Sequence, residues 1–228
     1  MTSKNISPKV LVGQHLAKKV PSSGAVIGIG TGSTVDAALS AIGERIRLEQ
    51  LTISAITTSI VSSQKAFAEG ITVLDNSYPN ELVFGFDGAD AVDSRRRVIK
   101  GKGGAMLREK LLAAKCKEYI IIIDDSKLTD NLATKCPVPI EVIPEALTLV
   151  ERKLKNFNAK SWKIRTGTSL FGPTITELGN IILDVDFDDI PDTFERDLKA
   201  IPGVVETGLF LAYATEVLVA GVDGIRSF

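Results

Sequence analysis

The sequence has few of the residues on which metal centres and disulfide scaffolds depend. Its 228 residues include one histidine, His15, and two cysteines, Cys116 and Cys136. Neither cysteine has a CxxC partner or a nearby histidine, so we expect two reduced thiols and no zinc site. His15 lies in a helical pattern, which favours a structural role. Chemistry in this chain must therefore depend on carboxylates, lysines and backbone amides.

An excess of charge of one sign and long hydrophobic runs are also absent. The formal net charge is −1, which predicts no nucleic-acid partner and no membrane partner. The longest apolar runs, near residues 119–123 and 217–222, have the length of strands. The N-terminal segment MTSKNISPKV lacks the apolar stretch of a signal peptide. We therefore expect a cytoplasmic globular protein with one or two domains.

The stretch from Asp87 to Lys110, DGADAVDSRRRVIKGKGGAMLREK, is the most informative part of the chain. The apolar run 82–86 before it predicts a buried strand. Three carboxylates lie at or just beyond the C-terminal end of that strand: Asp87, Asp90 and Asp93. They can orient hydroxyl groups of a ligand, although aspartate is also a common turn residue after a strand.

A glycine-rich turn and a helix complete this stretch. The turn Lys100–Gly104 lacks most Cβ atoms, so its backbone N–H groups can approach a ligand closely. The segment 105–114 is a strong helix former. It carries Glu109 on the same face as Leu112 and other apolar residues. A carboxylate on an apolar face beside a basic loop is a candidate general base, whereas the alternative is a solvated surface charge.

A second glycine loop joins a strand and a helix near the N-terminus. Ala25–Ile29 predicts a short strand, Gly30–Thr34 a loop, and the residues from Val35 a helix. Successive N–H groups at a helix N-terminus favour an anion, and the hydroxyls of the loop can donate to phosphate oxygens. The loop matches the dinucleotide pattern GxGxxG only in part and lacks the GK[ST] of a P-loop. It predicts a monophosphate site, with a hydroxyl-capped turn as the alternative.

Strands alternate with helices over the first half of the chain, and polar loops follow the strands. The last of these loops is Asp124–Lys127, after the apolar run 118–123. This order predicts an α/β fold with an open, mainly parallel Rossmann-like sheet. Ligands of such sheets bind beyond the carboxyl ends of the strands.

Composition changes after Pro137, and the order β-α-β, β-α-β then predicts a second, smaller ferredoxin-like α+β domain. We predict a catalytic α/β domain of residues 1–132 and 208–228, and a ferredoxin-like domain of residues 133–207. The aspartates at 184–189 could bind a cation, but positions along a strand and in a solvated loop explain them better.

The loops together suit proton transfer next to the carbonyl group of a sugar phosphate. They offer an anion cradle, carboxylates for sugar hydroxyls, lysines for developing negative charge and Glu109 as a base. Moving a proton between C2 and C1 through a cis-enediolate needs one carboxylate and several cations or N–H donors near the oxyanion. No group suited to a redox cofactor is present in the pattern.

Four motifs, GIGTGSTV, FDGADAVD, KGKGGAMLREK and DDSK, occur in this order and spacing. They closely resemble ribose-5-phosphate isomerase of type A, and the segments EVIP and IPGVVETGLF are similar to the same family. The resemblance covers essentially the whole chain. It implies interconversion of D-ribose 5-phosphate and D-ribulose 5-phosphate in the pentose phosphate pathway. It also implies no organic cofactor, no metal, and a homodimer or homotetramer.

The resemblance assigns a role to each motif. It implies that Glu109 is the proton-transferring base and that Lys100 lies near the enediolate oxygens. It also implies that the carboxylates of Asp87 and Asp90 orient hydroxyls and assist ring opening. The implied substrate-binding residues are Thr31, Gly32, Ser33, Thr34, Asp87, Gly88, Ala89, Asp90, Lys100, Gly101, Lys102, Gly103 and Lys127. Whether the phosphate or the sugar hydroxyls of the substrate lie at residues 30–34 stays open.

Three positions depart from the family pattern: Ala91, Lys102 and Leu107 stand where a glutamate, a glycine and a threonine-like residue are usual. None of the departures removes a charged group with an implied role in chemistry. Lys102 raises a question, because a side chain costs free energy if the backbone there needs a positive φ. Its charge could also change substrate affinity.

Two other functions compete with the isomerase. A sugar-phosphate sensor domain would need a DNA-binding segment, and the N-terminus is too short for a helix-turn-helix with a basic recognition helix. A CoA-transferase-like enzyme could use Glu109 as a nucleophile, but no site for the large CoA moiety is recognisable.

Overall fold

The structure, a computed structural model, describes residues 6–21, 23–167 and 171–228. Internal contacts divide the chain into two compact units. Unit 1 contains the segments Met1–Gly88, Leu111–Lys127 and Tyr213–Phe228, and unit 2 contains Ala89–Lys110 and Leu128–Ala212. Each unit therefore contains segments far apart in the sequence.

Unit 1 is built on a seven-stranded sheet with the order β14-β13-β7-β4-β1-β2-β3. The strands are β1 (Val26–Ile29), β2 (Ser54–Thr57), β3 (Thr72–Val73), β4 (Leu82–Asp87), β7 (Cys116–Asp124), β13 (Glu216–Gly221) and β14 (Gly224–Ser227). All neighbours pair in parallel except β13 and β14, which form an antiparallel hairpin. The predicted open, mainly parallel sheet is confirmed.

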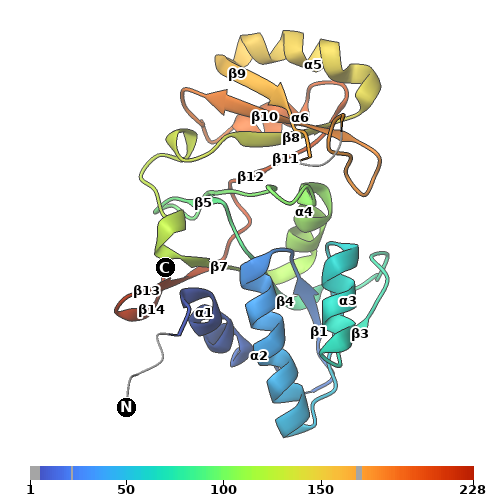
Figure 1. The fold of residues 1–228 in the computed structure, drawn as a ribbon, viewed down its shortest axis with the longest axis vertical. Helices are drawn as coiled ribbons and strands as arrows, with labels where there is room; N and C mark the ends of the chain where they lie inside the picture. The colour runs from blue at the N-terminus through green and yellow to red at the C-terminus, as the bar shows by residue number, and fades with distance from the viewer. Residues whose placement is uncertain (1–5, 22, 168–170) are drawn as a thin grey trace. The chain divides into compact units, whose positions relative to one another are not determined.

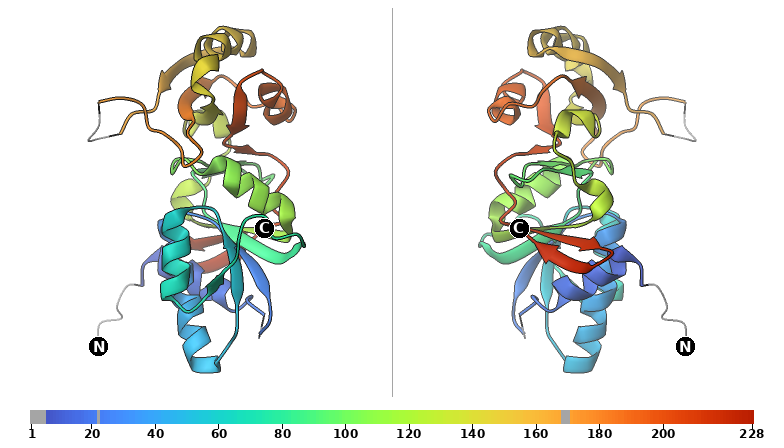
Figure 2. Two further views of the ribbon diagram at one scale, coloured as in Figure 1. Left: turned by 90° about the vertical axis from the view of Figure 1, so that its right-hand side faces the viewer. Right: turned by 90° about the vertical axis from the view of Figure 1, so that its left-hand side faces the viewer.

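Three helices, α1 (Pro8–Ala17), α2 (Ser33–Glu49) and α3 (Ile60–Ala68), accompany this sheet. Helices α1 and α2 lie side by side (Figure 1). Their close approach requires glycine at position 13 of α1, because a Cβ atom there would lie 2.8 Å from the backbone of Ala37 and Ala38. Strands β13 and β14 lie beside α1 (Figure 2). The largest core of the unit contains Leu16, Ile27, Leu39, Phe86 and Ile122, all at most 1% exposed.

Unit 2 contains a four-stranded antiparallel sheet with the order β11-β8-β10-β9. Its elements follow the order β8 (Val138–Val142), α5 (Leu147–Leu154), β9 (Ala159–Ile164), β10 (Ile181–Phe187), α6 (Phe194–Lys199) and β11 (Val204–Thr207). Both βαβ halves therefore interleave as in a ferredoxin-like domain, which confirms the predicted α+β class.

A small three-stranded sheet completes unit 2. It has the order β12-β6-β5, with β5 (Ala91–Val92), β6 (Val98–Ile99) and β12 (Leu209–Phe210). The sequence predicts a hairpin near residues 94–99, and the turn between the antiparallel strands β5 and β6 forms it. Arg96 takes a positive φ of 61° there, and Asp93 accepts hydrogen bonds from the N–H groups of Arg95 and Arg97. Asp93 is therefore a hairpin residue.

The remaining described elements are four short 3₁₀ turns and the helix α4. The turns are η1 (Asp125–Lys127), η2 (Leu132–Thr134), η3 (Pro144–Ala146) and η4 (Lys155–Phe157). Helix α4 (Met106–Lys115) begins among the residues of unit 2 and continues into those of unit 1.

Most element positions agree with the sequence predictions, with differences at two element starts and two unpredicted strands. Helix α2 begins at Ser33 instead of Val35, and β7 begins at Cys116, two residues before the apolar run 118–123. Strands β12 and β14 were not predicted. The sequence also predicts a turn-rich connection at 166–173, of which residues 168–170 lie outside the described residues.

The predicted domain boundaries, after residues 132 and 207, stay a prediction.

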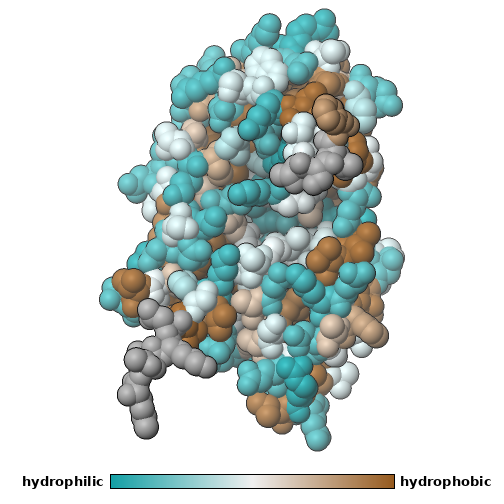
Figure 3. All heavy atoms as spheres, in the orientation of Figure 1, coloured by the Kyte–Doolittle hydropathy of each residue, from teal (hydrophilic) through white to brown (hydrophobic). Residues whose placement is uncertain are grey.

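The surface in Figure 3 is mostly hydrophilic, with hydrophobic residues in small groups. Within the described ranges, no helix has both the length and the apolar character that a bilayer crossing requires.

Candidate active site

The candidate residues of unit 1 lie at the C-terminal edge of its parallel strands. Strands β2 and β3 extend the sheet on one side of β1, whereas β4, β7 and β13 extend it on the other. The chain therefore changes direction between β1 and β4, which is where open α/β sheets form a ligand crevice. Thr31 follows β1 and Asp87 ends β4, so both flank this switch point.

Asp87 is completely buried and is held by donors on both of its oxygens. Its Oδ1 accepts hydrogen bonds from the N–H of Thr31 at 3.2 Å and from the N–H of Gly88 at 2.7 Å. Its Oδ2 accepts one from the hydroxyl of Tyr119 at 3.1 Å. These donors fix the direction of the carboxylate beside the loop that follows β1.

Three glycines of β1 and the loop after it are required for three different reasons. A Cβ on Gly28 would lie 2.9 Å from the side chain of Leu112 and 3.1 Å from the Cys116 sulfur, so this glycine serves packing. A Cβ on Gly30 would lie 2.0–2.4 Å from the Asp87 carboxylate. Gly32 has a φ of 127° and precedes α2.

The hydroxyls of this loop have separate partners. Thr31 Oγ1 lies within 2.8–3.1 Å of the hydroxyl oxygens of Thr58, Ser59 and Ser62, so it ties the loop to the start of α3. Ser33 Oγ instead accepts a hydrogen bond from Nζ of Lys9 at 2.7 Å. No sequence motif marks Lys9, because this residue lies 24 positions earlier in an ordinary helical pattern.

Lys127 is a further candidate of unit 1. It ends the turn η1 directly after β7 and is half-buried. Since β7 lies parallel to β4, Lys127 follows the same edge of the sheet as Asp87.

Unit 2 places the two remaining catalytic candidates in contact. Lys100 Nζ and Glu109 Oε2 form an ion pair, with side-chain exposures of 3% and 4%. Glu109 is therefore a buried carboxylate on α4 and not a solvated surface charge. The Lys100 ammonium also lies 5.3 Å from the centre of the buried Phe210 ring, close enough for a cation–π interaction.

A second buried lysine follows Glu109. Lys110 Nζ lies 2.7 Å from Glu195 and 2.8 Å from Glu206, and 4.8 Å from the same Phe210 ring. Burial alone would raise the pKa of Glu206. The Lys110 ammonium and its hydrogen bond, together with the Thr207 N–H and Lys199, outweigh burial and lower that pKa.

The turn Lys100–Gly104 has two residues with positive φ, Gly101 at 100° and Gly104 at 77°. Lys102 is not one of them, so the expected backbone penalty for a side chain at this position does not arise. Lys102 is exposed, and its N–H donates to Oδ2 of Asp90 at 3.0 Å. Asp90 is therefore oriented by the glycine turn.

Gly88 and Ala89 are half-buried and connect Asp87 to Asp90. Gly103 is exposed in the glycine turn. The usual glutamate position is occupied by Ala91, which is buried in β5, and Leu107 is half-buried in α4.

Other side chains weighed from the sequence take structural partners. Asp184 pairs with Arg165, Asp186 accepts from Ser161 at 2.6 Å, and Asp188 pairs with Lys160. Among the residues that the structure describes, no group of three or more His, Cys, Asp or Glu could hold a metal ion.

The two cysteines are free of disulfide bonds, as expected. Burial raises the pKa of the Cys116 thiol to about 12, so this thiol is unreactive at neutral pH. His15 is half-buried in α1.

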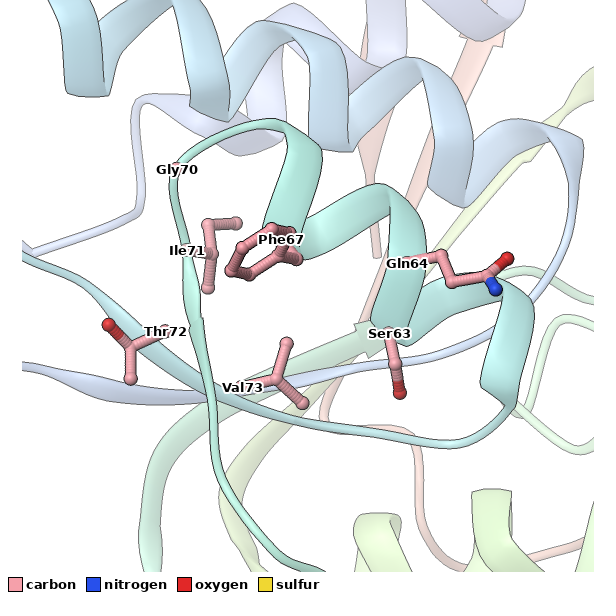
Figure 4. A pocket seen from close by; sticks show the side chains of 7 residues that line it. All are labelled: Ser63, Gln64, Phe67, Gly70, Ile71, Thr72 and Val73. Carbon is pink, nitrogen blue, oxygen red and sulfur yellow. The ribbon is translucent and has the colours of Figure 1, made fainter.

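A pocket of about 670 Å³ lies along α3 and β3 (Figure 4). Its lining residues are Ser63, Gln64, Phe67, Gly70, Ile71, Thr72 and Val73. None of them is an acid or a base, so the pocket offers no group for proton transfer.

The sequence profile described as ribose 5-phosphate isomerase A (phosphoriboisomerase A) matches residues 54–224. A protein named ribose-5-phosphate isomerase A from Synechococcus sp. is 40% identical over 207 residues, which cover 90% of this chain and 89% of the relative. One of the same name from Thermosynechococcus vestitus is 40% identical over 220 residues, covering 95% and 92%.

Solved structures agree over the whole length. Ribose 5-phosphate isomerase A from Methanocaldococcus jannaschii aligns with a TM-score of 0.92 and 36% identity, covering 99% of each chain. A D-ribose-5-phosphate isomerase in complex with phospho-erythronic acid aligns with a TM-score of 0.93 and 34% identity, again covering 99% of each chain. This chain therefore belongs to the ribose-5-phosphate isomerase A family.

Proposed function

We propose that this protein interconverts D-ribose 5-phosphate and D-ribulose 5-phosphate by proton transfer through a cis-enediolate. The observation that carries the proposal is the buried pair of Glu109 and Lys100, in a chain of this family. The Lys100 ammonium favours the charged form of a neighbouring carboxylate. In that form Glu109 can accept a proton from the substrate.

In the proposed reaction, Glu109 takes the proton from C2 of the open-chain aldose. The C2–H electron pair then forms the C1=C2 bond of the enediolate, and negative charge develops on O1. The same carboxylate returns the proton to C1, while the O2 hydroxyl proton moves to O1, so that O2 becomes the ketone oxygen. General acid–base catalysis of this kind supplies roughly 10²–10⁴-fold in rate.

Lys100 has the charge that the enediolate oxygens need, and donors aimed at a developing oxyanion are often the largest contribution to catalysis. We assign ring opening to Asp87, because its buried carboxylate has a fixed direction. Asp90, oriented by the Lys102 N–H, is assigned to sugar hydroxyls together with Gly88 and Ala89.

We place the substrate phosphate at residues 30–34. Helix α2 begins there and offers backbone N–H groups and a positive dipole end to an anion. The Lys9 ammonium, next to Ser33 Oγ, adds a positive charge at the same helix end. Asp87 borders the loop on the Gly30 side, where a hydroxyl suits a carboxylate better than a phosphate does. Lys127 is assigned as a further substrate-binding lysine.

The proposal requires neither an organic cofactor nor a metal ion, because all steps use carboxylates, ammonium groups and N–H donors. Family membership supports a place in the pentose phosphate pathway, a cytoplasmic location and a homodimer or homotetramer. Sedimentation of the purified chain would measure the oligomeric state directly.

The test is conversion of ribose 5-phosphate by the purified, chelator-treated chain and by its Glu109→Gln variant. We expect rapid conversion by the wild type and a loss of roughly 10³-fold or more in the variant, with binding of the sugar phosphate retained. Glu118→Gln is the matched control, because Glu118 is an exposed glutamate of β7. Wild-type turnover in Glu109→Gln would remove Glu109 from the base role. Tight binding without any conversion by the wild type would favour the sensor.

A further inference from the structure

Two carbonyl groups of the glycine turn accept hydrogen bonds from Arg165, a residue outside the four sequence motifs. Arg165 Nη1 donates hydrogen bonds to the carbonyl oxygens of Gly101, at 2.8 Å, and Lys102, at 3.0 Å. Arg165 follows β9, 64 positions beyond the turn, and belongs to unit 2 like the turn itself. The contact therefore joins the end of one sheet strand to two consecutive peptide groups.

Asp184 of β10 orients this arginine from its other side. Nε of Arg165 donates to Oδ2 of Asp184 at 3.0 Å, and Nη2 pairs with Oδ1. The two side chains are only 15% and 14% exposed. The Arg165 backbone N–H is also bonded to the carbonyl of Ile182 at 2.8 Å. Both the main chain and the guanidinium of Arg165 are thus held by β10.

Holding these carbonyls determines where the N–H groups of the same peptides point. In a planar trans peptide the C=O and N–H bonds point in opposite directions. Since the Gly101 carbonyl faces Arg165, the Lys102 N–H points away from it and reaches Asp90. Likewise the Lys102 carbonyl faces Arg165, so the Gly103 N–H points away from it. No described residue accepts a hydrogen bond from that Gly103 N–H.

We propose that Arg165, oriented by Asp184, is a positioning residue for the isomerase reaction. It acts through the turn by directing the Gly103 N–H, and the Asp90 carboxylate bonded to Lys102, toward the reacting oxygens of the substrate. Arginine is required because one planar guanidinium must bind a carboxylate with two of its nitrogens and two carbonyls with the third. This inference rests on the proposed function.

The test compares Arg165→Lys and Asp184→Asn with Arg196→Lys as the control. Arg196 pairs with Asp197 on the exposed face of α6 in the same unit. We expect kcat to fall about 10–100-fold in the first two variants, because a displacement of roughly 1 Å in a site can cost 10²-fold. We expect KM for ribose 5-phosphate to change less than about threefold, since uniform binding is retained. The control should keep wild-type values.

Binding of two probes separates positioning from general damage to the fold. Phospho-erythronic acid has a planar carboxylate that resembles an enediolate, whereas inorganic phosphate tests only the phosphate end. Arg165→Lys should weaken the first at least about tenfold and leave the second unchanged. Equal weakening of both probes, or a kcat within twofold of the wild type, would overturn the inference.

A third measurement does not depend on turnover. Amide hydrogen exchange should accelerate at Lys102 and Gly104 in Arg165→Lys, because the Lys102 N–H donates to the Asp90 carboxylate and the Gly104 N–H donates to the Gly101 carbonyl. Unchanged exchange would show that Arg165 does not hold the turn, even if the wild type isomerises. If the wild type fails to isomerise ribose 5-phosphate but the variant still exchanges faster at these amides, the proposed function is refuted. The role of Arg165 in holding the turn is then retained.

Discussion

Replacing Lys110 with methionine should destabilise unit 2 strongly. Lys110 is the cation between two carboxylates, Glu195 and Glu206, and its side chain is only 7% exposed. Methionine keeps most of the length of the aliphatic stem and its contact with Phe210, but it removes the charge. The variant therefore tests the ion pairs more than the packing.

The structure sets the size of the effect. Removing one partner of a buried ion pair costs about 3–5 kcal/mol, because the other charge stays buried without compensation. The lower end applies here, since Lys199 remains 3.2 Å from Glu206. At about 2–4 °C per kcal/mol for a chain of this size, a loss of about 3 kcal/mol lowers Tm by roughly 6–12 °C.

The loss of Tm in Lys110→Met should also depend on pH. In the wild type the Glu206 pKa is lowered, so its contribution to stability is complete above its ordinary value of 4.5 and is lost as pH falls through the folded-state pKa. Without Lys110, burial dominates and should raise this pKa in the variant. Protonation then favours the folded variant, and the Tm difference from the wild type should shrink between pH 8 and pH 5.

Thermal unfolding of Lys110→Met at several pH values is the assay, with Lys117→Met as the control. Lys117 makes only a 3.7 Å contact with Glu81, and both side chains are more than two-thirds exposed. Adding Glu206→Gln to Lys110→Met should restore part of the lost stability. A Tm loss below about 2 °C, or a deficit that is independent of pH, would refute the account of Lys110 as the compensating charge.

Three further outcomes follow from the site. Lys100→Ala should lower kcat roughly 10²-fold or more in a steady-state assay with little change in KM; a pure rise in KM would make Lys100 a binding residue. Gly30→Ala should reduce kcat because its Cβ would displace the Asp87 carboxylate, whereas Gly167→Ala, with open space around it, should not; equal activity of both variants would contradict this. The Cys116 thiol, with a pKa of about 12, should react roughly 10³-fold more slowly at pH 8 with a disulfide reagent in the folded than in the unfolded chain; similar rates would show that it is not buried in solution.

Local patterns in the sequence predicted most of the elements and the motif residues. Alternation and apolar runs mark strands, and a period of 3.6 marks helices, because these depend on residues close together in the chain. For the same reason Glu109 could be placed on the apolar face of a helix. Its ion pair with Lys100, nine positions earlier, could not be predicted, since the pair requires the turn Lys100–Gly104 to bring the two side chains together.

Other features had no local signal at all. The strand β14 follows an ordinary turn, and β12 is only two residues long. The bond from Ser33 to Lys9 spans 24 positions, and the bond from Asp87 to Tyr119 spans 32. From the sequence alone, Lys9 looks like an ordinary helix residue and Tyr119 like an ordinary strand residue. Their partners become visible only when the fold is known.

The sequence alone determined the α/β class, the glycine loops after β1 and β6, the helix that carries Glu109, and the motifs of the family, because all of these are properties of short segments. The tertiary structure decided the strand order, with its switch point between β1 and β4, and the reason for each of the glycines 28, 30 and 32. It also decided that Lys100 and Lys110 contact the same Phe210 ring and that Arg165 donates hydrogen bonds to the glycine turn. These depend on contacts between residues tens of positions apart. Such contacts are set by strand register and side-chain packing, which no spacing within one segment records.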